Sequence, residues 1–196
     1  MSIAALLGRP RDGSRNVVIE KAAIELLREL GYERVSIESI AQRAGVSKAT
    51  IYRRWKSKAE LITDAVHHYA FCKATTIDTG SLRGDLIESI SEKVKIMKSA
   101  DGQLIAGLMA ASRSDCDLSD VLTSSMTQGA SAAYSAIFDR AIKRGEISKA
   151  ARPERIFELM PAVIGFRLFM SHQVVNRKFI ENFVDEVLIP LLKYNN

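Results

Sequence analysis

The segment from Ser36 to Trp55 reads SIESIAQRAGVSKATIYRRW and places polar and basic side chains at helical spacing. A second helix is predicted within it, from Lys48 to about Trp55, with Ile51 and Trp55 facing inward. Its outward face then carries Lys48, Ala49, Thr50, Tyr52 and Arg53. Hydroxyl, ammonium and guanidinium groups on an exposed helix can bind base edges and phosphate oxygens. The segment therefore predicts a helix that enters a groove of DNA.

Capping residues define two short helices in this segment. Ser36 and Ser47 are good N-cap residues, because a serine hydroxyl accepts from the unpaired N–H groups of the first turn. Between them, Gly45 ends the first helix, since glycine adopts the left-handed conformation required there without a Cβ clash. The apolar face of that first helix consists of Ile37, Ile40, Ala41 and Ala44. Two helices joined by such a tight turn form a helix-turn-helix.

The charge of this region also favours DNA. Between Glu38 and Glu60 the sequence contains basic residues but no acidic residue. A basic run alone is equally typical of a solvated helix face, and the caps and turn favour the DNA interpretation. We expect Lys48, Thr50 and Tyr52 to contact base edges or the DNA groups that flank them. The phosphate side of the predicted surface comprises Ser36, Arg43, Ser47, Arg53, Lys56 and Lys58.

The residues AQRAGVSKATIYRRWKSKAELI, preceded by GYERVSIESI, resemble the N-terminal DNA-binding domain of the tetracycline-repressor family of bacterial regulators. The resemblance extends from about Asn16 to Val66. It implies a phosphate contact for Lys58. Arg53 and Arg54 differ from the residues that are commonest in the family at these positions. This difference affects which DNA sequence the protein would prefer, not whether it would bind DNA. A weaker resemblance in PAVIGFRLFMSH and NFVDEVLIPLL implies a homodimer whose last helices pair as a four-helix bundle, and family members commonly bind small effectors in this half.

Composition narrows the class of protein. The chain has 196 residues, of which 47% are hydrophobic, and a net charge of +5. It is long enough for a substantial core. Two cysteines indicate no disulfide framework and suit a reducing compartment. There is no apolar run of membrane-spanning length and no signal-peptide pattern at the N-terminus, so we expect a cytoplasmic protein without a membrane partner.

Helical periodicity and an absence of strand alternation predict an all-α fold of about nine helices. We predict a basic arm at 1–14, a DNA-binding domain at 15–58, a connector helix at 59–79 and a ligand-binding and dimerisation domain at 80–196. The arm could lie in a minor groove or along phosphates, or be a frayed terminus. Asp117 is predicted to cap a long helix, and Pro161 to kink a later one.

Two sets of apolar residues in the C-terminal half suggest further roles. An excess of large apolar residues on the last two helices predicts a dimer interface, although some of them belong to an ordinary core. That interface set is Leu159, Val163, Phe166, Phe179, Phe183 and Val187. Methionines and aromatic residues elsewhere suit an effector cavity, or plain core. The pocket set is Met97, Leu104, Leu108, Met109, Met126, Tyr134, Phe138 and Phe169, with Arg113 and Arg167 as candidate anchors.

We therefore expect a sequence-specific regulator that binds a near-palindromic operator as a homodimer and is released by a small effector that shifts the fourth helix. No common catalytic motif is present and no cofactor is expected, so the chain is not expected to be an enzyme. His68 and Cys72 lie four apart, which leaves a metal-responsive regulator as one alternative. A non-specific architectural DNA-binding protein is the other.

Overall fold

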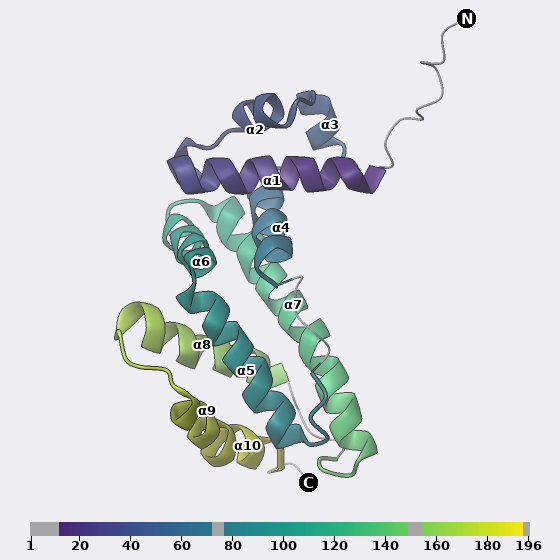
Figure 1. Ribbon diagram of the computed structural model, residues 1–196, viewed down its shortest axis with the longest axis vertical. Coiled ribbons are helices and arrows are strands. Elements are labelled where there is room, and N and C mark those ends of the chain that lie inside the picture. Colours follow the sequence, from purple (N-terminus) through teal and green to yellow (C-terminus); the bar gives the residue numbers. More distant parts are fainter. Residues whose placement is uncertain (1–11, 72–76, 149–153, 194–196) are drawn as a thin grey trace, which may run out of the picture.

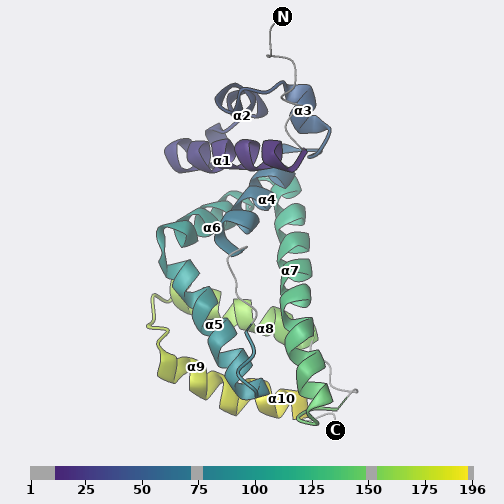
Figure 2. The same cartoon turned by 45° about the vertical axis from the view of Figure 1, so that its right-hand side comes forward.

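The computed structural model describes residues 12–71, 77–148 and 154–193. This described part is helical and contains no strand, in agreement with the predicted all-α fold. Figures 1 and 2 show an elongated molecule with a small group of helices at one end and a longer bundle below it.

The small group forms the head of the molecule. The first helix begins at Asp12, so residues 12–14 of the predicted arm are helical, and residues 1–11 lie outside the described part. In chain order the head contains α1 (Asp12–Leu30), η1 (Tyr32–Arg34), α2 (Ile37–Ala44), α3 (Lys48–Tyr52) and α4 (Lys58–Phe71). The α-helical hydrogen bonding of α3 ends earlier than predicted, and Trp55 follows it in a turn in which its N–H donates to the Ile51 carbonyl at 3.1 Å.

The longer bundle forms the body. Its helices are α5 (Leu82–Lys98), α6 (Ala100–Ala111), α7 (Cys116–Lys143), α8 (Glu154–Gly165) with η2 (Phe166–Met170), and α9 (Arg177–Phe183) with η3 (Val184–Leu188) and α10 (Ile189–Lys193). No residue separates α8 from η2, or α9 from η3 and α10, so each set forms one continuous helical segment. The predicted N-cap of the long helix was wrong, because the carboxylate of Asp115, not Asp117, accepts the Leu118 N–H at 2.9 Å. Pro161 lies inside α8, and its kink stays a prediction.

The buried apolar residues form two clusters, an upper one in the head and a lower one in the body. The lower cluster joins α5, α7, α8, α9, η3 and α10. The upper cluster joins α1 to α4, yet it also includes Leu108 of α6 and Leu118 of α7, which are 1% and 0% exposed. The packing thus crosses the predicted boundary between the DNA-binding domain and the rest of the chain. The predicted domain boundaries stay predictions. The head and the top of the body nevertheless share one apolar core.

A buried carboxylate fixes the start of α5. Asp85 is fully buried, accepts hydrogen bonds from the N–H and hydroxyl of Thr79, and pairs with Arg140 and Arg144 at 3.2 and 3.4 Å. Burial raises the pKa of this carboxyl, but the hydrogen bonds from Thr79 and the two guanidiniums outweigh burial, so its net pKa is lowered. The segment that precedes α5 is thereby tied to the C-terminal end of α7. None of the described helices has the length and hydropathy needed to cross a bilayer.

Gly45 offers a test of the turn between α2 and α3. Its φ of 64° is in the left-handed region, so Gly45→Ala should destabilise the fold by about 1–2 kcal/mol and lower Tm by a few degrees. The matched control is Gly107, which lies within α6 and has open space where a Cβ would stand. Gly107→Ala should instead stabilise by about 0.5–1 kcal/mol. Equal changes in Tm for the two variants would contradict the claim that the left-handed backbone at residue 45 requires glycine.

Candidate DNA-binding surface

The first helix of the helix-turn-helix is capped at both ends. The Ser36 hydroxyl accepts the N–H of Ser39 at 3.1 Å, and the Ser39 hydroxyl accepts the N–H of Ser36 at the same distance. At the other end Gly45 takes the left-handed conformation, and the Val46 N–H donates to the Ala41 carbonyl at 3.0 Å. These bonds use local groups only, which is why the sequence could predict them.

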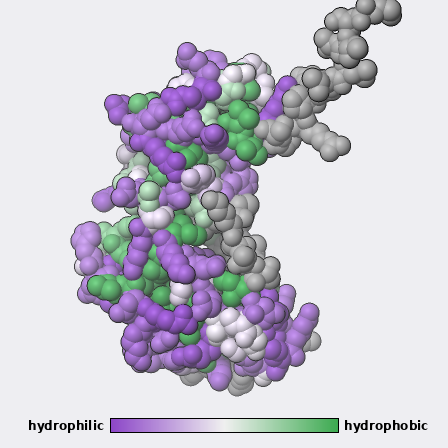
Figure 3. All heavy atoms as spheres, in the orientation of Figure 1, coloured by the Kyte–Doolittle hydropathy of each residue, from purple (hydrophilic) through white to green (hydrophobic). Residues whose placement is uncertain are grey.

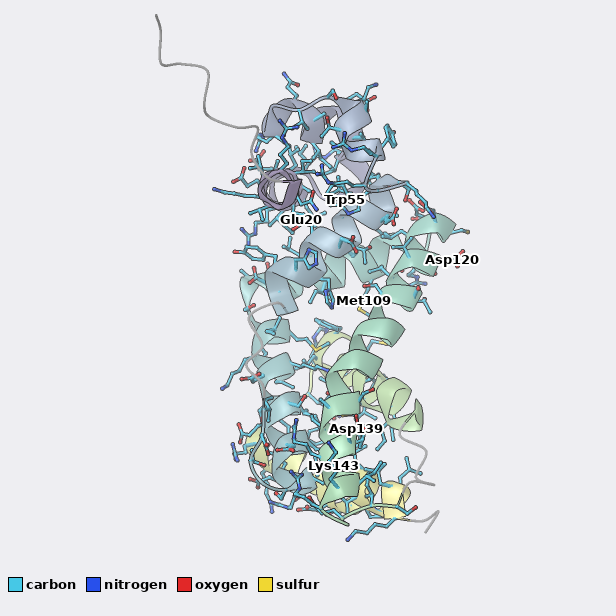
Figure 4. All side chains as sticks on the ribbon, turned by 90° about the vertical axis from the view of Figure 1, so that its right-hand side faces the viewer. Glu20, Trp55, Met109, Asp120, Asp139 and Lys143 are labelled. Carbon is cyan, nitrogen blue, oxygen red and sulfur yellow. The ribbon has the colours of Figure 1, made fainter. Side chains whose placement is uncertain are left out.

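The second helix is fixed by a cap, a buried side chain and a tryptophan. Ser47 accepts the N–H of Thr50 at 3.2 Å, and the two hydroxyls lie 3.0 Å apart. Ile51 is fully buried below the helix. The indole N–H of Trp55 donates to the Asp64 carboxylate of α4 at 2.9 Å, so the chain after α3 is anchored to α4. Figure 4 labels Trp55 at this position between the head helices and α4.

The predicted recognition face does point outward. Lys48, Ala49, Tyr52 and Arg53 are exposed and Thr50 is partly exposed. Figure 3 shows largely hydrophilic surface over the end of the molecule that α1, α2 and α3 form. Because α3 is held from below by Ile51 and Trp55, its outward side chains stand on a rigid support.

Two cations of the predicted surface are already paired within the protein. The Lys48 ammonium lies 2.6 Å from the Glu38 carboxylate of α2, and this hydrogen bond raises the pKa of Lys48 and lowers that of Glu38. The Arg43 guanidinium donates two hydrogen bonds, at 2.9 and 2.8 Å, to the Glu29 carboxylate of α1, which raises the pKa of Arg43. Lys48 remains on the recognition face, whereas Arg43 also links α2 to α1.

Lys56 and Lys58 lie in different surroundings. Lys56 is exposed beside the start of α4. Lys58 is partly buried, and its ammonium donates to the Tyr32 carbonyl at 3.2 Å and lies 4.0 Å from the centre of the Tyr32 ring. A phosphate contact from Lys58 stays a prediction, and it would require the side chain to leave Tyr32.

Tyr32 connects the head to the body. Its hydroxyl donates to the Asp115 carboxylate at 3.1 Å, and Asp115 is the N-cap of α7. Burial, followed by this hydrogen bond, raises the pKa of the Tyr32 phenol. Beside it the Arg28 guanidinium of α1 pairs with Asp101 of α6 at 2.8 Å. These cross-links could not be predicted from the sequence, because their partners lie far apart in the chain.

The predicted pocket residues do not line one site. Tyr134 and Phe138 belong to the lower apolar cluster, and Met97 packs against it. Leu104 and Leu108 belong to or pack against the upper cluster. Met109 and Met126 are exposed, and Phe169 is partly buried in η2. Figure 4 labels Met109 near the junction of head and body. Of the candidate anchors, Arg113 is exposed, and Arg167 is stacked 3.9 Å from the Phe179 ring.

The predicted dimer residues divide between core and surface. Phe183 is 7% exposed and Leu159 packs against the lower cluster, whereas Phe166 is 56% exposed and Val187 is also exposed. Val163, Phe166, Phe179 and Phe183 line an open groove of ≈ 380 Å³. Met170 and Val174, which the sequence analysis did not select, are exposed next to it. Figure 3 shows hydrophobic residues at the surface around the position of α8.

Of the two proposed metal ligands, His68 lies within the described residues and Cys72 does not. The His68 ring nitrogen lies 3.1 Å from the Glu20 carboxylate, and Cys72 lies outside the described residues. Within the described ranges no group of three potential metal-binding side chains occurs. The metal-responsive alternative therefore has no geometric support here.

Comparison with known proteins identifies both parts of the chain. Residues 19–65 match the model for bacterial regulatory proteins of the tetR family, and residues 76–187 match the tetracyclin repressor-like C-terminal domain. The chain is 31% identical to an HTH-type transcriptional regulator of Mycobacterium tuberculosis, covering 97% of this chain and 96% of the relative. It is 32% identical to a DNA-binding transcriptional repressor of Mycobacteroides abscessus, with coverages of 93% and 96%.

Solved structures agree with this fold. A TetR family transcription regulator superposes with a TM-score of 0.72 at 24% identity over 89% of this chain and 96% of its own. GusR of Salmonella enterica superposes with a TM-score of 0.62 at 22% identity, with coverages of 91% and 95%. The matched relatives named above are regulators rather than enzymes. The chain belongs to the tetracycline-repressor family of bacterial helix-turn-helix transcriptional regulators.

Proposed function

We propose that this regulator binds a near-palindromic operator as a homodimer and represses transcription until a small effector releases it. The observation that carries the proposal is the outward face of α3, mounted on Ile51 and the Trp55–Asp64 hydrogen bond. A helix held in this way keeps its side chains aligned with a major groove. Repression is supported by the relative from Mycobacteroides abscessus, which is named as a repressor.

The residues of the surface divide by role. Thr50, Tyr52 and Lys48 reach base edges or groups beside them, since they project from α3. Ser36, Ser47, Arg53 and Lys56 lie at helix starts and around α3, where contacts with phosphates set the register of the protein on the duplex. Arg43 reaches a phosphate only by leaving Glu29, and Lys58 only by leaving Tyr32.

Exposed apolar residues of η2, of the segment after η2 and of η3 support dimerisation. Phe166, Met170, Val174 and Val187 expose apolar area on neighbouring segments. A second copy that covers this surface would remove that area from water and place two recognition helices on one duplex. Two-fold pairing fits a palindromic site, because each half-site then meets an identical helix.

The effector acts through the shared upper core. α4 packs against α1 on one side and against α6 and α7 on the other. Tyr32 and Asp115 add a polar link between η1 and the start of α7. A ligand that prefers one position of α6 and α7 would therefore shift the whole head, and thus the separation of the two recognition helices. Its effect on DNA affinity equals its differential affinity for the two positions.

Selection of bound fragments from random genomic DNA tests the function directly. We expect the recovered fragments to share a palindromic site, bound at least about a thousandfold more tightly than unrelated duplex. Thr50→Ala and Tyr52→Ala should change which bases are preferred in that site. Equal affinity for all fragments would instead support a non-specific architectural protein, a class that the comparisons do not favour.

Lys56 allows the phosphate contacts to be counted. Lys56→Ala should weaken binding to every duplex and reduce the slope of log K against log salt by about 0.9 for each lost contact, hence by about two units for a dimer. Lys95→Ala on the exposed face of α5 is the control and should leave the slope unchanged. The measurement is fluorescence anisotropy over a range of salt concentrations. An unchanged slope for Lys56→Ala would remove this residue from the phosphate contacts.

Phe166 and Val187 allow the dimer surface to be tested without disturbing the core. Phe166→Glu and, separately, Val187→Glu should convert dimers into monomers in sedimentation, because a carboxylate would be buried in the interface. Phe183 is unsuitable, because it is buried within the protomer and its loss would test folding. Met109→Glu, at an exposed site on α6, is the control and should remain dimeric. Dimers in both interface variants would place the interface elsewhere.

A further inference from the structure

A carboxylate lies within the proposed DNA-binding surface, next to the recognition helix. Glu38, in the first turn of α2, accepts from the Lys48 ammonium at the start of α3 at 2.6 Å. It is the one acidic residue in the sequence from 36 to 59, whose other charged residues are all basic. The Glu38 side chain is 64% exposed and that of Lys48 54% exposed, so a duplex can reach both groups.

The positions of the two helix starts do not depend on this ion pair. The Ser47 hydroxyl caps the start of α3, and Ile40 of α2 and Ile51 of α3 are fully buried in the upper apolar cluster. Water and salt screen an ion pair as exposed as this one, so its contribution to folding is small. The packing of α2 and α3 therefore brings Glu38 and Lys48 together, and the pair is free to open without loss of the fold.

A phosphate would offer Lys48 the same kind of partner that it already has. Carboxylate and phosphate oxygens are both anionic acceptors of a charge-assisted hydrogen bond. A lysine surrounded by water gains the full contact with a phosphate, whereas Lys48 gains only the difference between the two partners. The exchange also leaves the Glu38 carboxylate to attract a cation from solution, which offsets the ions that the phosphate releases.

We propose that Glu38 tunes the affinity of this regulator for DNA by competing with the duplex for the Lys48 ammonium. The inference rests on the DNA-binding function proposed above and adds an acidic residue to those that set the strength of binding. Glu38 is a positioning residue, since it acts through Lys48 and itself bonds no group of the DNA. Because a dimer has two such pairs, a modest effect at each head multiplies in the binding constant.

The test is a double-mutant cycle in the full-length protein, measured by fluorescence anisotropy with a labelled mixed-sequence duplex of about 30 base pairs. Glu38→Gln keeps the size of the side chain and removes its charge, so it should tighten binding about twofold to twentyfold per dimer. The slope of log K against log salt should steepen by up to about two units, because each freed ammonium can neutralise one more phosphate. A merely structural role of Glu38 would not change this slope.

Lys48→Met tests whether the carboxylate acts through Lys48. In the Lys48→Met background, Glu38→Gln should no longer tighten binding, because the ammonium for which the carboxylate competes is gone. The matched control is Asp139→Asn, which removes one negative charge from an exposed position of α7 in the body and should leave the affinity unchanged. Figure 4 labels Asp139 far from the head. Thermal unfolding of each variant verifies that the fold is retained.

Three results would overturn the proposal. The first is a folded Glu38→Gln variant that binds the duplex no more tightly than the unaltered protein. The second is equal tightening with and without Lys48, which would mean that Glu38 repels phosphates directly. The third is equal tightening by Asp139→Asn, which would mean that net charge alone is responsible. Failure of the unaltered protein to bind any duplex at low salt is a separate result, and it would overturn the DNA-binding function itself together with this inference.

Discussion

The packing of α4 against both halves of the molecule is the constraint on which the rest of the structure depends. The upper apolar cluster runs from α1 through α4 to Leu108 of α6 and Leu118 of α7, without a gap at the boundary between the matched domains. A close-packed interior transmits displacement because it does not deform continuously. Among the described residues, the DNA-binding head and the top of the body are therefore joined by one continuous apolar core.

Polar contacts at the edge of that core add cross-links between its elements. Tyr32 lies between the Lys58 ammonium and the Asp115 carboxylate, and Arg28 pairs with Asp101 nearby. Each contact joins a head element to α4, α6 or α7. At the lower end, Asp85 ties the segment before α5 to Arg140 and Arg144 near the end of α7. Both ends of α7 are thus tied to other elements.

Local signals made much of the fold predictable from the sequence. Ser36, Gly45 and Ser47 act through hydrogen bonds to residues three or four positions away, so their roles can be read from spacing alone. The residues of the predicted pocket are divided between two cores, with Leu104 beside the upper cluster and Tyr134 in the lower one, and spacing along the chain could not separate them. The hydrogen bond from Lys93 to Tyr134 was not predicted for a similar reason, since a lysine on a helix is usually solvated and its partner lies on another helix. The N-cap of α7 was predicted at Asp117 and lies at Asp115, because two nearby aspartates are equally good caps when only the sequence is known.

The Glu38–Lys48 ion pair has a consequence for how the protein searches a chromosome. The proposed recognition helix carries its own counterion, so a DNA phosphate or base that binds Lys48 would compete with the Glu38 carboxylate. On a wrong sequence this exchange returns little free energy, and the protein dissociates or slides onward sooner. On the right sequence the base contacts of the neighbouring side chains compensate for the exchange. Under the proposed recognition mode, an internal anion of this kind would shorten the residence time at decoy sites and so sharpen the contrast between random DNA and the true target.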